Sequence, residues 1–259
     1  MDSFLGFPDD TTIIVTGAAS GIGRELALLA GRQGLAVGAW DLTEEGARST
    51  ADEIAASGGT SLALGVDASS EEQVVAAMER TVSQLGPVNC LAAAAGPPSF
   101  GAADFDDGLH KALSCMRLPT EAWIASGPAG VKSAVYLSSV QGPRYGAGVQ
   151  WYTVAKSAID GYMRSVAAMR QGGLRANAVL PDWIVTPRTR EYVEATGGAE
   201  WDANPMGRVG LPEDVANAAL FLLSPAAGYL NGLSIEVDGG VRLRSAAWMR
   251  MAEASGSAA

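Results

Sequence analysis

Cysteine and histidine are almost absent from this sequence. Its 259 residues include two cysteines, Cys90 and Cys115, and one histidine, His110. The cysteines lack the paired spacing of a zinc site, and two are too few for a disulfide framework. A single histidine removes most histidine-based metal sites and Ser-His-Asp triads from consideration. We therefore expect no metal and interpret both cysteines as small core residues.

Positive charge is also scarce. Eighteen Lys and Arg residues face 28 Asp and Glu residues, which gives a net charge of −10 and an isoelectric point near 4.6. No basic run forms a local exception, so phosphate backbones and anionic lipid surfaces are repelled. We expect a small-molecule substrate as the partner, and neither nucleic acid nor membrane.

Long apolar runs are missing as well. No stretch reaches the roughly 18 uninterrupted apolar residues of a spanning helix, and the first residues, MDSFLGFPDD, lack the basic-then-apolar order of a secretion signal. We therefore expect a cytoplasmic protein. Apolar residues still make up 48% of the chain and charged residues only 18%, so a sizeable core can be buried.

What the sequence does contain is a regular alternation of short apolar runs with longer segments of three-to-four-residue period. Such alternation implies parallel strands joined by right-handed crossovers. It predicts an α/β fold with a doubly wound, Rossmann-type parallel sheet of about seven strands and helices on both faces. The predicted strands are 11–17, 35–40, 61–66, 88–96, 133–139, 174–180 and 233–239, and the predicted helices include 21–34, 71–86, 110–123 and 212–224.

Neither an internal repeat nor a Pro/Gly/Ser linker divides the chain, so we expect a single domain over residues 1–252. Residues 187–210 are polar and punctuated by glycine without a clean period, which is typical of a substrate lid. A second irregular loop is expected at 97–108, and a disordered tail at 253–259.

A glycine-rich turn, TGAASGIG (16–23), follows the first predicted strand and opens a helix. Its glycines let the backbone approach a pyrophosphate at the positive end of that helix. Alone, such a turn also suits a tight connection that binds nothing. Here Asp41 ends the second strand 18 residues after Gly23, near the spacing expected of a carboxylate that binds the adenosine ribose. The combination predicts dinucleotide binding.

Asp41 also bears on the choice of cofactor. A carboxylate accepts hydrogen bonds from ribose hydroxyls but repels a 2′-phosphate, and Ser20 inside the turn is not basic. NAD(H) is therefore favoured over NADP(H). The alternative for Asp41 is a solvated strand end.

Tyr152 and Lys156 are four residues apart in a predicted helix and so project from the same face. An ammonium near a phenol favours the phenolate and lowers the tyrosine pKa, which makes a usable general acid or base. Ser139 ends a strand 13 residues before Tyr152, where its hydroxyl can hold a substrate oxygen.

Together these residues resemble the short-chain dehydrogenase/reductase family, in its single-domain branch of about 250 residues. The resemblance covers nearly the whole chain. It rests on TGAASGIG (16–23), Asp67 in GVDAS, SSVQG followed by YTVAK, LPDWIVTP (180–187), NPMGRVGLPEDVA (204–216) and the ending VDGG (237–240).

The resemblance implies catalytic roles for Ser139, Tyr152 and Lys156: substrate orientation, proton exchange, and support of the phenol and the nicotinamide ribose. It implies an NAD(H)-dependent alcohol dehydrogenase or ketone reductase that forms a homotetramer. Its substrate is expected to be a mainly apolar, cyclic secondary alcohol or ketone. The expected cofactor-binding residues are Gly17, Ser20, Gly21, Ile22, Gly23, Asp41, Asp67, Ala68, Ala94, Gly96, Tyr152, Lys156, Pro181, Ile184 and Thr186, and the expected substrate pocket contains Gln141 and Trp183.

Three departures from the family pattern stand out. Residues 93–96 read AAAG, without the amides that usually brace the central strand. No asparagine occurs between positions 89 and 177 to hold a relay water, which leaves Ser114, Cys115 or Met116 near that place. Finally, Asp182 replaces the usual glycine after Pro181 and is followed by Trp183, an apolar wall for the pocket.

Other residues have both a functional and a structural interpretation. His110 is either a substitute proton carrier or a solvated helix residue. Trp151, Trp183 and Trp201 either line the pocket or pack in the core or at a subunit interface. Arg188 and Arg190 either bind an anionic substrate group or extend into solvent from a polar loop. Alternative functions are a dehydratase, an isomerase, a biosynthetic redox step, or a non-catalytic dinucleotide-binding scaffold.

Overall fold

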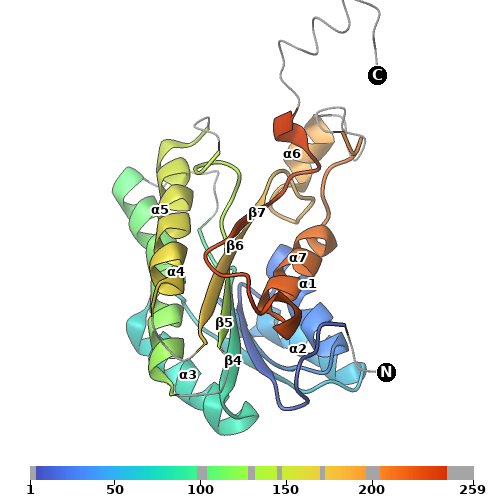
Figure 1. Ribbon diagram of the computed structural model, residues 1–259, viewed down its shortest axis with the longest axis vertical. Coiled ribbons are helices and arrows are strands. Elements are labelled where there is room, and N and C mark those ends of the chain that lie inside the picture. The colour runs from blue at the N-terminus through green and yellow to red at the C-terminus, as the bar shows by residue number, and fades with distance from the viewer. Residues whose placement is uncertain are drawn as a thin grey trace, which may run out of the picture.

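Seven parallel strands form one sheet at the centre of the computed structural model, which describes residues 4–97, 104–127, 132–144, 148–169, 173–196 and 205–243. Their order is β3-β2-β1-β4-β5-β6-β7, so the chain reverses direction across the sheet between β1 and β4 (Figure 1). This is the predicted doubly wound fold. The strands are β1 (Thr12–Thr16), β2 (Ala36–Asp41), β3 (Ser61–Gly65), β4 (Val88–Ala93), β5 (Ser133–Leu137), β6 (Arg175–Pro181) and β7 (Ser234–Val237).

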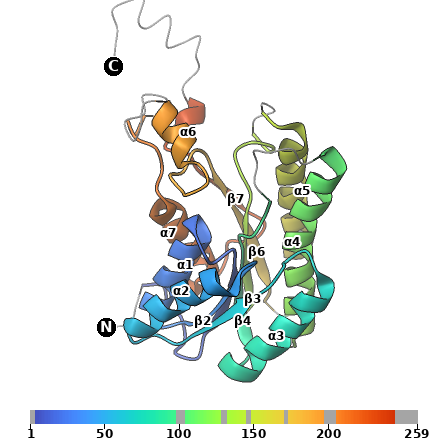
Figure 2. The ribbon, with the colours of Figure 1, turned by 180° about the vertical axis from the view of Figure 1, so that it is seen from behind.

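Helices cover both faces of the sheet. Figures 1 and 2 show α1, α2 and α7 on one side and α3, α4 and α5 on the other, and each side buries its own apolar cluster against the strands. No helix of the described segments is long and apolar enough to cross a membrane. The helices are α1 (Gly21–Arg32), α2 (Glu44–Ala56), α3 (Glu71–Leu85), α4 (Phe105–Ala125), α5 (Gln150–Ala167), α6 (Arg190–Ala195) and α7 (Pro212–Leu223), with short 3-10 turns η1 (Pro225–Ala227) and η2 (Val241–Leu243).

Helix α4 begins earlier than the sequence predicted. Asp104 caps it by accepting hydrogen bonds from the backbone N–H groups of Asp106 at 2.8 Å and Asp107 at 3.4 Å, so the last four residues of the expected loop 97–108 are helical. Gly108 is required in this first part of the helix, because a Cβ there would lie 2.6 Å from the Trp151 ring of α5. The close approach of α4 and α5 brings one side of the site into place.

The expected lid, 187–210, is described only in part. It contains the short helix α6, which the sequence reading did not predict. Trp201 and the remainder of 197–204 lie outside the described residues, as does the expected tail 253–259.

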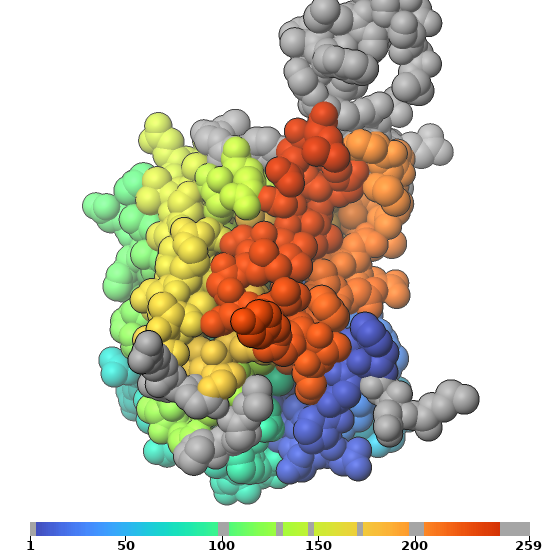
Figure 3. All heavy atoms as spheres, viewed as in Figure 1, coloured from blue at the N-terminus to red at the C-terminus, as the bar shows by residue number. Residues whose placement is uncertain are grey.

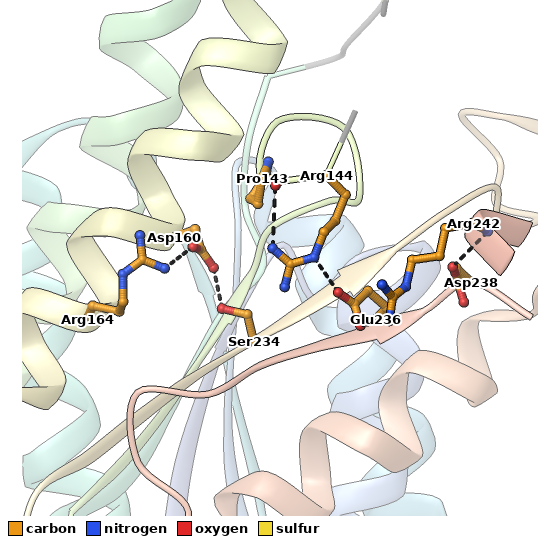
Figure 4. A network of polar contacts seen from close by, with 8 residues as sticks. All are labelled: Pro143, Arg144, Asp160, Arg164, Ser234, Glu236, Asp238 and Arg242. Carbon is orange, nitrogen blue, oxygen red and sulfur yellow. Dashed lines mark hydrogen bonds and ion pairs between the residues drawn. The ribbon is translucent and has the colours of Figure 1, made fainter. Parts of the chain in front are cut away.

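Strand β7 is an edge strand that polar contacts tie to its neighbours. Figure 3 shows the C-terminal residues, orange to red, at the surface beside the yellow α5. In Figure 4, Glu236 of β7 pairs with Arg144 from the loop after β5 and, at 3.1 Å, with Arg242 of η2. Asp160 of α5 likewise accepts a hydrogen bond from the Ser234 hydroxyl and forms an ion pair with Arg164. The Arg144–Glu236 pair ties the loop after β5, which lines the site, to the edge strand, and the Asp160–Ser234 bond ties α5 to it.

Candidate active site

A cavity of about 910 Å³ opens at the carboxyl ends of the strands, where the loops after β1 to β6 meet. This is the position expected for a ligand in a doubly wound sheet, next to the point where strand order reverses. All the residues that the sequence nominated for the site line this cavity. They are Gly17, Ser20, Gly21, Ile22, Gly23, Asp41, Asp67, Ala68, Ala94, Gly96, Ser139, Gln141, Tyr152, Lys156, Pro181, Trp183, Ile184 and Thr186.

The glycine turn has a shape that side chains would prevent. Gly17 and Gly21 have φ angles of 71° and 57°, in the left-handed region that favours glycine. A Cβ on Gly23 would lie 2.2 Å from the carbonyl oxygen of Gly17, so no other residue fits without moving the turn. Helix α1 starts at Gly21 and has no acidic residue in its first turn. Its N-terminus therefore presents free N–H groups and positive potential to the cavity, which suits a pyrophosphate.

A hydroxyl braces the segment after β4, where residues 93–96 lack the side-chain amides of the family pattern. Thr16 Oγ1 accepts hydrogen bonds from the backbone N–H groups of both Ala94 and Ala95, each at 3.0 Å. The hydroxyl joins the ends of β1 and β4 where strand order reverses. This end of the sheet is therefore held in place although residues 94 and 95 are alanines.

Two carboxylates line the adenosine side predicted from the sequence. Asp41 is half-buried and its Oδ2 accepts a hydrogen bond from the Ala19 N–H at 2.9 Å, so it faces the glycine turn and is not a solvated strand end. Asp67 Oδ1 accepts from the Ser69 hydroxyl at 2.6 Å and from its N–H at 2.9 Å. Both hydrogen bonds lower the pKa of Asp67 and keep it ionised, and the one from the hydroxyl has the larger effect.

Tyr152, Lys156 and Ser139 meet on the opposite side of the cavity. Ser139 lies beside the Tyr152 phenol and opposes the rise in its pKa; its hydroxyl accepts from the Gln141 N–H at 3.1 Å and donates to the Pro181 carbonyl at 3.4 Å. Lys156 Nζ donates to the Leu137 carbonyl at 2.7 Å and lies 5.4 Å from the centroid of the Tyr152 ring. The i and i+4 positions therefore share one face of α5, as the spacing predicted.

The pKa of Tyr152 differs from the expectation. Burial raises it above its ordinary value, and the Ser139 hydrogen bond and the charge of Arg188 only oppose that rise. Burial, followed by the charge of Arg188, lowers the pKa of Lys156 to about 8. The predicted lowering of the tyrosine pKa is thus wrong for the cofactor-free protein, because removal of the phenol from water outweighs the nearby charges.

Of the three α4 residues that the sequence placed near the missing asparagine, Cys115 is the one that lines the cavity. Ser114 and Met116 are buried away from the cavity, Met116 within the apolar cluster under α3, α4 and α5. Burial raises the pKa of the Cys115 thiol to about 11, and the charge of Asp67 acts in the same direction. A neutral thiol therefore faces the cavity from this part of α4, and a thiol is a weak hydrogen-bonding group.

Of the residues with both a functional and a structural interpretation, some line the cavity and others do not. Trp183 lines the cavity, whereas Trp151 is buried against Ala155 and packs edge-on to Tyr152, with ring centroids 5.8 Å apart. His110 is exposed and does not line the cavity. Within the described segments, no group of His, Cys, Asp and Glu is arranged to hold a metal ion.

Several cavity residues were missed by the sequence reading of the site. The clearest are Lys111, Gly148, Val149 and Asp182; Arg188, which had two interpretations, also lines the cavity, whereas Arg190 does not. Lys111 precedes Cys115 by four residues on α4, so helical spacing alone indicated that both face the same side. Asp182 was noted as a departure from the family pattern but not as a cavity residue; burial, followed by the charge of Asp238, raises its pKa.

Comparison with known proteins agrees with this geometry. A family model described as enoyl-(acyl carrier protein) reductase matches residues 17–242. L-rhamnose 1-dehydrogenase (NAD(P)(+)) of Azotobacter vinelandii is 36% identical over 252 residues, covering 90% of this chain and 96% of that protein. Cis-4-hydroxycyclohexanecarboxylate dehydrogenase of Sinomonas cyclohexanicum is 33% identical, covering 88% and 94%. The chain belongs to the short-chain dehydrogenase/reductase family.

A solved structure supports the same fold. The crystal structure of a short-chain type dehydrogenase/reductase from Mycobacterium marinum superimposes with a TM-score of 0.83 at 24% identity, covering 90% of this chain and 96% of that one. Family membership makes the protein an oxidoreductase that binds a nicotinamide dinucleotide. The residues present fit such a cofactor, because the cradle at Gly23 excludes any side chain and opens onto the N-terminus of α1.

Proposed function

We propose that the protein is an NAD(H)-dependent oxidoreductase that interconverts a secondary alcohol and a ketone on a mainly apolar, cyclic substrate. One observation supports this above all: Ser139, Tyr152 and Lys156 line the same cavity as the glycine turn and Asp41. A protein that only binds a dinucleotide has no chemical need for the first three residues.

In this proposal Tyr152 exchanges a proton with the substrate oxygen through its phenol O–H. Its raised pKa keeps the phenol protonated at neutral pH, which prepares it to donate to a ketone oxygen. Ser139, beside the phenol, orients the same substrate oxygen. The nicotinamide, when bound, supplies or accepts the hydride. Lys156 binds the adjacent ribose and, when charged, stabilises the phenolate that forms as the proton leaves.

The preference for NAD(H) rests on Asp41. Its carboxylate ends β2 beside the glycine turn and is held by the Ala19 N–H at 2.9 Å, so it cannot easily turn away from a ligand. A 2′-phosphate at this place would meet an unscreened negative charge. The relative from Azotobacter is named for both NAD and NADP. For this chain we propose a preference for NAD(H) alone, because of Asp41.

The apolar part of the substrate is assigned to the wall made by Trp183 and Val149, both of which line the cavity and are half-buried. Aromatic and aliphatic surface of this kind binds a ring by excluding water. The relative from Sinomonas is named for a hydroxycyclohexane substrate, which supports a cyclic alcohol here.

The test has two parts. NADH and NADPH are titrated against the protein by nucleotide fluorescence, and NADH absorbance is followed with a panel of cyclic alcohols and ketones. We expect tighter binding of NADH and turnover of at least one cyclic secondary alcohol. Cofactor binding without turnover of any panel member would favour a non-catalytic scaffold or one of the altered chemistries, and preference for NADPH would contradict the role of Asp41.

A further inference from the structure

Arg188 reaches across the cavity from the loop that follows β6. Arg188 lies two residues after Thr186. Its side chain is exposed to solvent overall and also lines the cavity. Its guanidinium donates to the backbone carbonyls of Gly96 and Pro97, in the loop after β4, both at 3.4 Å. Strong hydrogen bonds from N–H groups are close to 2.9 Å, so these two contacts are weak. The guanidinium spans two walls of the cleft while most of its donor capacity goes unused.

The carboxylates of the cavity do not pair with this guanidinium. Among the ion pairs of the described residues none includes Arg188. Asp41 accepts a hydrogen bond from the Ala19 N–H, and Asp67 accepts one from the Ser69 hydroxyl. The third carboxyl, that of Asp182, has its pKa raised by burial and by the charge of Asp238. The protein therefore supplies a guanidinium fork to its cavity without a carboxylate to occupy it.

The position of this charge is close to the groups proposed to react. After burial, the charge of Arg188 is the next cause that lowers the pKa of Lys156 to about 8, and it also opposes the rise of the Tyr152 pKa. An anion paired with Arg188 would cancel this repulsion and favour the charged form of Lys156. A ligand anion at this place would therefore also raise the pKa of Lys156 and keep its ammonium charged to higher pH.

The same loop contacts the start of α1. A methyl carbon of Thr186 lies 3.2 Å from the position a Cβ would take on Gly21, the first residue of that helix. Because helix N-termini favour negative charge, the positive end of α1 and the guanidinium of Arg188 act on one part of the cavity. Two independent features thus favour an anion there.

We infer that Arg188 is an anion-binding residue of this cleft, whose guanidinium exchanges the carbonyls of Gly96 and Pro97 for an oxyanion of the ligand. A planar guanidinium binds two oxygens of a phosphate or a carboxylate at once. The oxyanion is either the cofactor's pyrophosphate or a carboxylate carried by the substrate. The inference rests on the proposed function, because both ligands belong to the proposed active site.

The test compares Arg188→Gln with Arg190→Gln. Both substitutions remove one positive charge from the same part of the chain, but Arg190 is exposed and does not line the cavity. The first arm measures dissociation constants for NADH, ADP-ribose and adenosine. The second measures binding of cyclohexanecarboxylate and of cyclohexanol to the complex with NAD.

In Arg188→Gln we expect a loss of affinity of about 10-fold or more for the oxyanion ligand, as for loss of hydrogen bonds to a charged group. A loss for NADH and ADP-ribose but not adenosine identifies the pyrophosphate, and a loss for cyclohexanecarboxylate but not cyclohexanol identifies a substrate carboxylate. If Arg188→Gln matches Arg190→Gln in both arms, the inference is overturned. Failure of the wild-type protein to bind NADH would instead contradict the proposed function.

Discussion

Replacing Lys156 by methionine should make the protein more stable at neutral pH while abolishing its activity. Lys156 is largely withdrawn from water on α5, and burial is the main cause that lowers its pKa from 10.5 to about 8. At about 1.4 kcal/mol per pKa unit, such a shift corresponds to about 3 kcal/mol of destabilisation at pH 7. Methionine keeps the length and packing of the side chain without the charge.

The net gain should be smaller than this figure. The Lys156 side chain keeps partial contact with solvent through the cavity. It also donates to the Leu137 carbonyl at 2.7 Å, and the variant leaves that carbonyl without this donor at a cost of about 1 kcal/mol. We therefore expect a gain of about 1–2 kcal/mol in the free energy of unfolding at pH 7.

The dependence on pH distinguishes this cause from better packing. Unfolded Lys156 keeps its proton up to about pH 10.5, whereas the folded residue loses it near pH 8. Between these values the unfolded state binds more protons, so wild-type stability rises with pH and the advantage of Lys156→Met shrinks. Urea unfolding at pH 7 and pH 10 measures this.

The exposed Lys111 provides a control for this measurement, since Lys111→Met should change stability by less than about 0.5 kcal/mol. Two results would refute the reasoning. One is a Lys156→Met variant that is less stable than wild type at pH 7. The other is a stability difference between that variant and wild type that does not change with pH.

Three further outcomes are expected. Asp41→Ala should weaken NADH binding and relax discrimination against NADPH in fluorescence titrations, and unchanged affinities for both would remove Asp41 from the site. Cys115→Asn places an amide that can hold a relay water in the cavity, so the solvent deuterium isotope effect on turnover should fall; an unchanged isotope effect would contradict a proton relay that limits turnover at this residue. Gly23→Ala places a Cβ 2.2 Å from the Gly17 carbonyl and should reduce both the melting temperature and NADH affinity, at a cost of about 1–3 kcal/mol. Gly161→Ala is its control, because a Cβ there meets nothing within 4 Å on α5 and should stabilise the helix slightly.

The sheet and its motifs were predictable because their signals are local. Each strand is a short apolar run, and the observed ends differ from the predicted ones by at most three residues. The glycine turn and Asp41 are likewise readable from spacing along the chain. Helix α4 began earlier than expected because the Asp104 cap lies inside a stretch, FGAADFDDG, whose glycines suggested a loop.

The parts that could not be predicted depend on contacts between distant segments. Which of three adjacent residues on α4 enters the cavity is set by packing against α5, and only the structure selects Cys115. The hydrogen bond from the Ala94 N–H to the Thr16 hydroxyl joins residues 78 positions apart, so spacing along the chain could not show it. The Tyr152 pKa was predicted in the wrong direction because burial cannot be read from a Tyr-x-x-x-Lys spacing.

The most direct test of the account is turnover by Tyr152→Phe, which removes the phenol proton and keeps the ring. Tyr162→Phe is the control, since Tyr162 lies on the same helix but packs edge-on to Tyr136 and does not line the cavity. With any substrate that the wild-type protein turns over, we expect Tyr152→Phe to lose about 100-fold or more in turnover with NADH affinity nearly intact, and Tyr162→Phe to stay active. Turnover by Tyr152→Phe at close to the wild-type rate would contradict the assignment of Tyr152 as the proton carrier.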